Sequence, residues 1–363
     1  MRTEELDYTL PEELIAQTPI EPRDSSRLLV LHREDGQLEH RIFRDIGDYL
    51  RPGDVLVANE SRVIPARLFG HKEPSGGKVE VLLLGQLEGT QWHCLVGGAR
   101  TRVGTRLRLD QVSADGVSAA PSPLTAEILT VGERGERVLE FSEPVESYFD
   151  DLGVMPLPPY IHEPLRDPER YQTIYSHTLG SAAAPTAGLH FTPELLLGLR
   201  DRGVGFAFVT LHVGLDTFRP ITEDAIEEHQ IHTEWGRLSL PVAEQINRAK
   251  VMGGRVIAVG TTSVRVLETA ARRGLLQTPD DTPGGTCPWR PLAPFEGFTD
   301  LYITPGFRFR VVDAMITNFH LPKSTLLALV MAFAGEDNIR HAYTEAIAQR
   351  YRFFSFGDAM VIL

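Results

Sequence analysis

The sequence predicts an α/β protein: a layered α/β main domain with an inserted small antiparallel β-barrel domain. Helix and strand patterns alternate at both ends of the chain, whereas short strands broken by Gly, Pro and Ser fill residues 63–143. A length of 363 residues also exceeds one ordinary domain. We therefore assign residues 1–62 and 154–363 to the main domain and residues 63–153 to the barrel.

The N-terminal part alternates between helix and strand patterns. We expect helices at residues 11–17 and 43–49 and strands at residues 27–31 and 54–59. The inserted part then predicts six short strands, at residues 64–69, 78–84, 92–96, 106–109, 124–130 and 137–141. Short strands at this spacing are typical of a small antiparallel barrel.

The alternation of helices and strands returns after residues 156–159. The expected helices cover residues 193–202, 241–252, 263–273, 325–334 and 339–350, and the expected strands cover residues 205–211, 255–259, 301–304, 314–318 and 360–363. Residues 277–294 are rich in Pro, Gly, Asp and Thr, which predicts a long surface loop.

Composition limits the possible classes of protein. A net charge of −13 favours solubility, and the two cysteines, Cys94 and Cys287, lack partners at metal-ligand spacing, which argues against a disulfide scaffold or a thiolate zinc site. The N-terminus lacks a signal-peptide pattern, and the longest apolar run, residues 326–334, is too short to span a bilayer. We expect a cytoplasmic protein without membrane contact, and a monomer.

Four polar turns at predicted strand ends form the candidate site, because ligands of open α/β sheets bind at the carboxyl ends of the strands. The candidate residues are Thr186, Gly188 and His190 in the first turn, His212, Gly214, Thr217 and Arg219 in the second, Thr261, Thr262, Ser263 and Arg265 in the third, and Asn318, His320, Lys323 and Ser324 in the fourth. A hydroxyl before a helix is most often a simple cap, so we base the candidate site on the recurrence of such residues at four turns. A fifth polar stretch, with Glu60 and Arg62, joins the two domains, where ligands also favour binding.

Two further patterns give weaker evidence for a binding site. Arg100, Arg102, Arg106 and Arg108 would share one face of a continuous strand, which fits a phosphate groove for nucleic acid about as well as a solvated barrel face, and Gly104 would break that strand. His229 and His232 lack the order and the third ligand of a metal site, so we predict no metal.

Together these stretches resemble the S-adenosylmethionine:tRNA ribosyltransferase-isomerase family of queuosine biosynthesis. The segments that resemble it are NESRVIPAR (59–67), APTAGLHF (184–191), TLHVGLDTFRP (210–220), GTTSVR (260–265) and TNFHLPKST (317–325). The departures are small: Asp216 stands where the family pattern suggests glycine, and Ala58 where it suggests a larger apolar residue.

The resemblance implies the two substrates and the products. The donor would be S-adenosylmethionine and the acceptor a tRNA with an aminomethyl-deazaguanine (preQ1) at the wobble position. The ribosyl group would become the epoxycyclopentanediol of epoxyqueuosine, with adenine and methionine released. No cofactor beyond the donor is implied.

Such chemistry needs a base, a proton donor and groups that stabilise oxyanions. We predict His190, His212, His320 and Glu60 as the acid and base groups. Arg62, Arg219, Arg265 and Lys323 would hold methionine's carboxylate or tRNA phosphate, and the turn at Thr261, Thr262 and Ser263 would cradle one of them. Thr186, Gly188, Gly214, Thr217, Asn318 and Ser324 complete the predicted substrate contacts.

Two other classes remain open from the residues alone. A nucleoside or base hydrolase could use similar histidine and hydroxyl loops without S-adenosylmethionine. A non-catalytic RNA-binding protein could use the barrel as an adaptor, although it would not need so many histidine-bearing turns. A methyltransferase is disfavoured, because no Gly-x-Gly loop follows an early strand.

Overall fold

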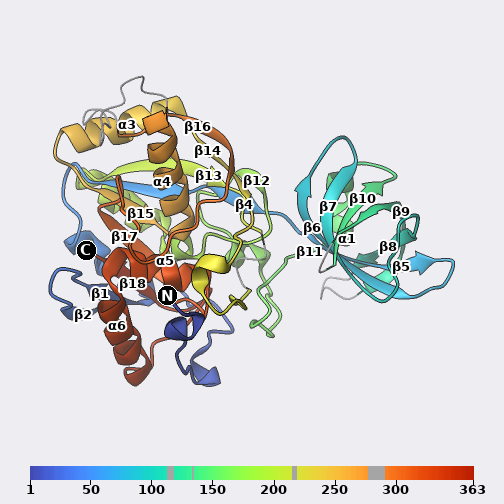
Figure 1. Ribbon diagram of the computed structural model, residues 1–363, viewed down its shortest axis with the longest axis horizontal. Helices are drawn as coiled ribbons and strands as arrows, with labels where there is room; N and C mark the ends of the chain where they lie inside the picture. Colours follow the sequence, from blue (N-terminus) through green and yellow to red (C-terminus); the bar gives the residue numbers. More distant parts are fainter. Residues whose placement is uncertain (113–117, 133–134, 215–218, 277–290) are drawn as a thin grey trace.

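The computed structural model describes residues 1–112, 118–132, 135–214, 219–276 and 291–363. Figure 1 shows a large α/β part beside a smaller β-barrel. The two parts have separate hydrophobic cores: the barrel core includes Leu68, Val81 and Leu107, whereas the main core includes Val57 and Ala258. The predicted fold class, α/β with an inserted antiparallel barrel, is confirmed.

A nine-stranded sheet forms the centre of the main part. In spatial order its strands are β16 (Phe295–Thr299), β14 (Glu234–Leu238), β13 (Gly205–Leu211), β3 (Val55–Asn59), β15 (Val256–Val259), β17 (Ala314–Asn318), β18 (Ala359–Ile362), β1 (Arg27–Leu31) and β2 (Leu38–Ile42). The four central strands from β13 to β17 are parallel to one another. Strands β3, β15 and β17 are fully buried, so they consist mainly of aliphatic residues rather than alternating polar ones.

Both faces of this sheet are covered, which makes three layers. Residues such as Val57 and Ala258 pack against α3 (Leu240–Val251), α4 (Thr261–Leu276), α5 (Thr325–Ala334) and α6 (Glu336–Ala348). Their strand neighbours, such as Leu56 and Ile257, point to the opposite face, towards α2 (Pro193–Asp201) and the 3₁₀ helices η4 (Phe43–Asp48) and η7 (Thr186–His190).

The barrel closes on itself. Its strands follow the order β5 (Arg67–Glu73), β6 (Lys78–Gln86), β7 (Gln91–Gly97), β10 (Glu136–Phe141), β9 (Ser118–Val131) and β8 (Arg106–Val112), and β8 pairs again with β5. The chain enters through β4 (Ser61–Val63) and returns through β11 (Gly153–Val154), which pairs with β5. Strand β12 (Thr178–Ser181) then pairs with β4.

Three local predictions were wrong. Residues 301–304 form no strand. The expected helix at residues 11–17 is only the short 3₁₀ turn η2 (Glu12–Leu14). The backbone of this segment bonds to Phe353 instead: the Phe353 amide donates to the Leu14 carbonyl, and the Phe353 carbonyl accepts from the Ala16 amide. The expected helix at residues 43–49 is the 3₁₀ helix η4.

Other elements differ in extent or were missed. Strand β5 starts at Arg67 rather than at residue 64, since Pro65 has no amide hydrogen to donate to a ladder. Strands β2, β12, β14 and β16 were not predicted. Most of the predicted loop at 277–294 lies outside the described residues. No helix in the described part of the chain has the length and hydrophobicity that a bilayer span requires.

Candidate functional site

The four predicted turns meet at the carboxyl ends of the central parallel strands. They line one small cavity of about 50 Å³, to which Thr186, Val213, Thr262 and Asn318 each contribute from a different turn. Thr261 and His320 also line it. Val213 and Asn318, 105 positions apart in the chain, are therefore brought together, because they follow parallel strands of one open sheet.

Polar atoms in this small cavity have unused hydrogen-bonding capacity. Thr262 Oγ1 and Asn318 Oδ1 are buried and have no hydrogen-bond partner among the described residues. Helix α4 begins at Thr261, so its first backbone N–H groups are also without intrahelical partners. The cavity therefore suits a small group that bears oxygen atoms.

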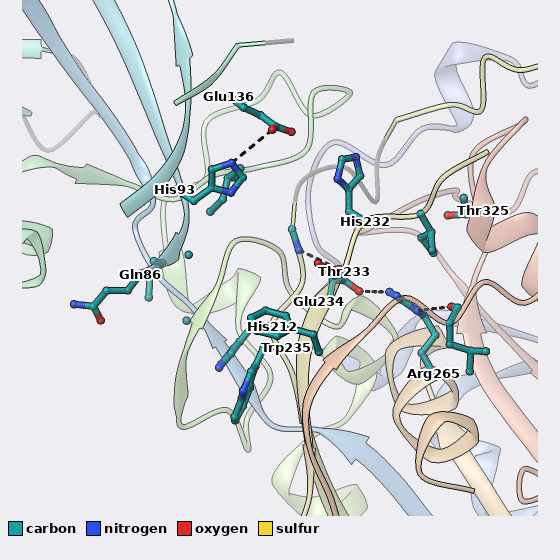
Figure 2. Close-up of a pocket in the computed structure, with 18 of the residues that line it drawn as sticks. Gln86, His93, Glu136, His212, His232, Thr233, Glu234, Trp235, Arg265 and Thr325 are labelled. Atoms are coloured by element: carbon teal, nitrogen blue, oxygen red, sulfur yellow. Dashed lines mark hydrogen bonds and ion pairs between the residues drawn. The ribbon is translucent and has the colours of Figure 1, made fainter. Parts of the chain in front are cut away.

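A second, larger cavity of about 660 Å³ lies between the main part and the barrel. His212, Gly214, Arg265 and Tyr302 line it on the main side, and the barrel contributes a further set, Leu84, Gly85, Gln86, Leu87, Trp92, His93 and Glu136. Leu326 lines both cavities, so the two are neighbours. Figure 2 shows His93 and Glu136 on the barrel side and His212, Trp235 and Arg265 on the main side. The volume is that of a typical small-molecule site.

His212 lines the large cavity as a neutral imidazole, and the next residue, Val213, lines the small one. Figure 2 shows the His212 ring beside that of Trp235. The two rings stack, with centroids 5.2 Å apart and an interplanar angle of 17°. Partial burial lowers the pKa of His212, so the ring is uncharged at neutral pH. Its buried Nδ1 has no hydrogen-bond partner in the described chain. Gly180, at φ +132°, leaves room for the ring, since a Cβ there would lie 2.9 Å from His212 Cε1.

Arg265 and Glu234 form a buried ion pair on the main wall of the large cavity. Arg265 Nη1 donates to Glu234 Oε2, and Arg265 Nε donates to the Leu301 carbonyl at 3.2 Å. Glu234 Oε1 accepts from the amide of Gly214 at 3.1 Å. The pair thus connects the turn after β13 with helix α4 and strand β14.

The other two predicted histidines are buried and strongly constrained. His320 lines the small cavity and its Nε2 lies 2.7 Å from Thr317 Oγ1. His190 lies behind Asn318, with Nδ1 2.7 Å from Ser26 Oγ and Nε2 3.3 Å from Asn318 Nδ2. Burial lowers the pKa of His190 to about 4 and that of His320 to about 3.

These two histidines make the folded chain sensitive to acid. Below pH 6.5 the unfolded chain protonates both imidazoles, whereas the folded chain keeps them neutral down to pH 4 or below, so the unfolded state binds more protons. We expect the free energy of unfolding to fall between pH 6.5 and pH 4, by on the order of 1–3 kcal/mol for each histidine. Denaturant titrations at a series of pH values measure this slope.

The variant His190→Asn should show a shallower slope than the unmodified protein, because one of the two buried bases is gone. His162→Asn, at an exposed side chain, is the matched control and should leave the slope unchanged. An identical slope in His190→Asn and the unmodified protein would contradict the assignment.

Several predicted residues lie away from the residues that line the two cavities. Glu60 accepts from Thr210 Oγ1 at 3.2 Å, Arg62 pairs with Glu169, and Lys323 pairs with Asp7 at 2.9 Å. The Asp7 carboxylate raises the pKa of Lys323.

Three more have structural contacts of their own. Ser263 Oγ donates to the Val259 carbonyl at 2.8 Å, and Ser324 caps helix α5 by accepting from the Leu327 amide. Gly188 leaves room for Tyr175, whose hydroxyl would lie 2.1 Å from a Cβ at that position.

The remaining predicted contact residues are Thr217, Arg219 and the four barrel arginines. Thr217 lies outside the described residues, and Arg219 is partly exposed at their edge. Arg106 and Arg108 lie on β8 and pair with Glu127 at 3.4 Å and Glu73 at 2.7 Å. The break expected at Gly104 is present: Gly104 has φ +78°, and Arg100 and Arg102 precede β8, so the four arginines do not lie on one continuous strand.

The structure also adds residues that the sequence did not single out. Glu234, Trp235 and Tyr302 line the large cavity from β14 and from the segment after β16, and His93 and Glu136 line it from the barrel. The sequence offered only a weak signal for these residues, the Glu234-Trp235 pair at the start of β14. In the described part of the chain, no group of three His, Cys, Asp or Glu residues is arranged to hold a metal ion.

Comparisons with known proteins give full-length matches. Residues 3–362 match the family described as "Queuosine biosynthesis protein". The chain is 54% identical to the S-adenosylmethionine:tRNA ribosyltransferase-isomerase of Symbiobacterium thermophilum and 52% identical to that of Carboxydothermus hydrogenoformans, each over all of both chains. The crystal structure of an S-adenosylmethionine tRNA ribosyltransferase from Thermotoga maritima matches with a TM-score of 0.54 and 42% identity, covering 99% of this chain and 100% of that one.

Proposed function

The chain belongs to the S-adenosylmethionine:tRNA ribosyltransferase-isomerase family of queuosine biosynthesis, and on that basis we propose the reaction that it performs and the roles of its residues. It is an enzyme that acts on S-adenosylmethionine and tRNA. We propose that it transfers and isomerises the ribosyl group of the donor onto the aminomethyl-deazaguanine (preQ1) base at the wobble position. The product would be epoxyqueuosine, and adenine and methionine would leave.

The observation that best supports this proposal is the position and state of His212. The reaction must begin with removal of a proton from the ribosyl carbon next to the sulfonium. His212 is a neutral imidazole with a buried, unoccupied Nδ1, and it lines the cavity that has the volume for the donor. We assign the general base to His212. His320 remains a candidate hydrogen-bond donor in the small cavity, and His190 and Glu60 would position neighbouring groups.

The small cavity fits the ribosyl oxygens. Thr262 Oγ1, Asn318 and the first N–H groups of α4 converge there. Negative charge develops on ribosyl oxygen when the ring opens and adenine departs. A helix N-terminus in a buried place stabilises such charge without reorganisation of the protein. Thr261 and Thr262 would therefore act on the sugar rather than on a phosphate.

The tRNA would approach from the barrel side. His93 and Glu136 of the barrel face the cavity opposite His212, so an anticodon nucleotide could enter between them. Arg106 and Arg108 would meet backbone phosphates further along the barrel, where their carboxylate partners would be displaced. We propose that the reaction needs no cofactor beyond S-adenosylmethionine and that a monomer is active in the cytoplasm.

One incubation tests the reaction. Purified protein with S-adenosylmethionine labelled in the ribosyl group should transfer label to preQ1-containing tRNA and release adenine and methionine in equal amounts. Chromatography of the small molecules and mass spectrometry of digested tRNA measure both. Adenine released without labelled tRNA would favour a hydrolase, and tRNA binding without any turnover of the donor would favour a non-catalytic RNA-binding protein.

A further inference from the structure

The buried pair of Arg265 and Glu234 has more hydrogen-bonding capacity than the protein uses. Arg265 is 6% exposed and its Nη2 has no hydrogen-bond partner among the described residues. Each guanidinium Nη carries two N–H donors. Glu234 accepts from Gly214 and Arg265, which leaves lone pairs on its two oxygens. A donor for an anion and an acceptor for a cation therefore lie side by side on one wall of the large cavity.

The charge balance of this pair restricts what can bind it. Arg265 and Glu234 cancel each other, so an added anion alone or cation alone would leave a net charge in a buried place, which is costly. A ligand that brings one anion and one cation at neighbouring atoms keeps the balance. The α-carboxylate and α-ammonium groups of an amino acid have this arrangement.

We propose that the Arg265–Glu234 pair binds the amino-acid end of the donor, with Arg265 Nη2 on the α-carboxylate and Glu234 on the α-ammonium of its methionine part. The identity of the donor rests on the proposed function. The protein pre-orders both side chains through the Leu301 carbonyl and the Gly214 amide, so little conformational entropy is lost on binding.

The surroundings of the pair agree with this pose. Trp235 follows Glu234 directly and stacks on His212, and Figure 2 shows Glu234 between Arg265 and these two rings. Leu326 and Leu329 line the same cavity and suit the methylenes of methionine. A donor held by its amino-acid end would then place its sulfonium near the ring of Trp235, where a cation is attracted, and the adjoining ribosyl carbon near His212.

Binding measurements on the unmodified protein test the pose directly. Isothermal titration calorimetry, without tRNA, would compare S-adenosylmethionine with its decarboxylated and deaminated analogues. The decarboxylated analogue brings only the ammonium and the deaminated analogue only the carboxylate, so each leaves a net charge at the buried pair. Each should therefore bind about 10- to 100-fold more weakly than the donor. Equal affinity of the donor and both analogues would overturn the proposal.

Two conservative variants assign the partners. In Glu234→Gln the preference for the donor over its deaminated analogue should fall to within about 3-fold, and in Arg265→Gln the preference over the decarboxylated analogue should fall likewise. The assignment would be contradicted if each variant lost both preferences. It would also be contradicted if each variant kept both. Arg237→Gln and Glu296→Gln are the matched controls, because this exposed pair links the same strand β14 to β16 and should leave both preferences intact.

The outcome can be separated from that of the proposed function. The calorimetry requires neither tRNA nor turnover, so the expected preferences without ribosyl transfer would uphold the subsite and reject the reaction. Ribosyl transfer with equal binding of the analogues would do the reverse. If a variant fails to fold, the analogue series with the unmodified protein still decides.

Discussion

Replacing His212 with asparagine is expected to lower kcat by about 10²- to 10⁴-fold, the usual contribution of a general base. The reason is that the asparagine side chain has no basic nitrogen and cannot accept the proton. Adenine release per enzyme per minute, at saturating donor and tRNA, measures the loss. His162→Asn, at an exposed histidine, should retain full activity.

The pH profile separates a base from a merely structural residue. A base works only when unprotonated, and burial lowers the pKa of His212, so kcat/KM should fall as pH drops through a value below 6.5. The residual activity of His212→Asn should lack that fall. If the variant kept more than about a third of normal turnover with an unchanged profile, the assignment of the base would be wrong.

A large loss of stability is expected for Glu268→Ala. Glu268 is fully buried on α4, and its carboxylate accepts from the backbone amides of Arg310, Val311 and Val312. Alanine would leave three buried N–H groups without partners, at a cost of about 3–5 kcal/mol. Chemical denaturation followed by far-UV circular dichroism measures the change in the free energy of unfolding.

Glu268→Gln keeps an oxygen acceptor at the same place and should lose roughly half as much stability. The exposed Glu244→Ala on α3 is the matched control and should stay within about 0.5 kcal/mol of the unmodified protein. A Glu268→Ala protein as stable as this control would show that the three amides find other partners.

Elements with strong local signals were predicted well. Strand β13 and helix α5 have the predicted bounds, because a buried β-rich run defines the first and the Ser324 cap followed by an apolar run defines the second. The expected helix at residues 11–17 failed because its partner, Phe353, is distant in sequence. The edge strand β16 pairs only with β14 in the described sheet, and no local residue pattern indicates that pairing.

The candidate site likewise has a part that the sequence predicted and a part that it did not. The convergence of three turns followed from topology, since β13, β15 and β17 are parallel and their carboxyl ends share one edge. The first turn follows β12, which pairs with β4 in a separate sheet, so tertiary packing brings it to the same place. The placement of each side chain did not follow. Glu234, which pairs with Arg265 from 31 positions away, and the barrel residues His93 and Glu136 join the cavity only through tertiary packing.

The order in which the chain connects the strands of the main sheet and the barrel affects the order of folding. Most strand pairs of the barrel join strands that are consecutive in the chain; the exceptions are β5–β8, β7–β10 and the added pair β11–β5. In the main sheet, by contrast, β1 pairs with β18, which lies 331 positions further along the chain. Contacts between near neighbours form sooner, because less chain must be closed into a loop. The barrel should thus assemble early, and β1 and β2 should dock late, after β18 has paired with β17.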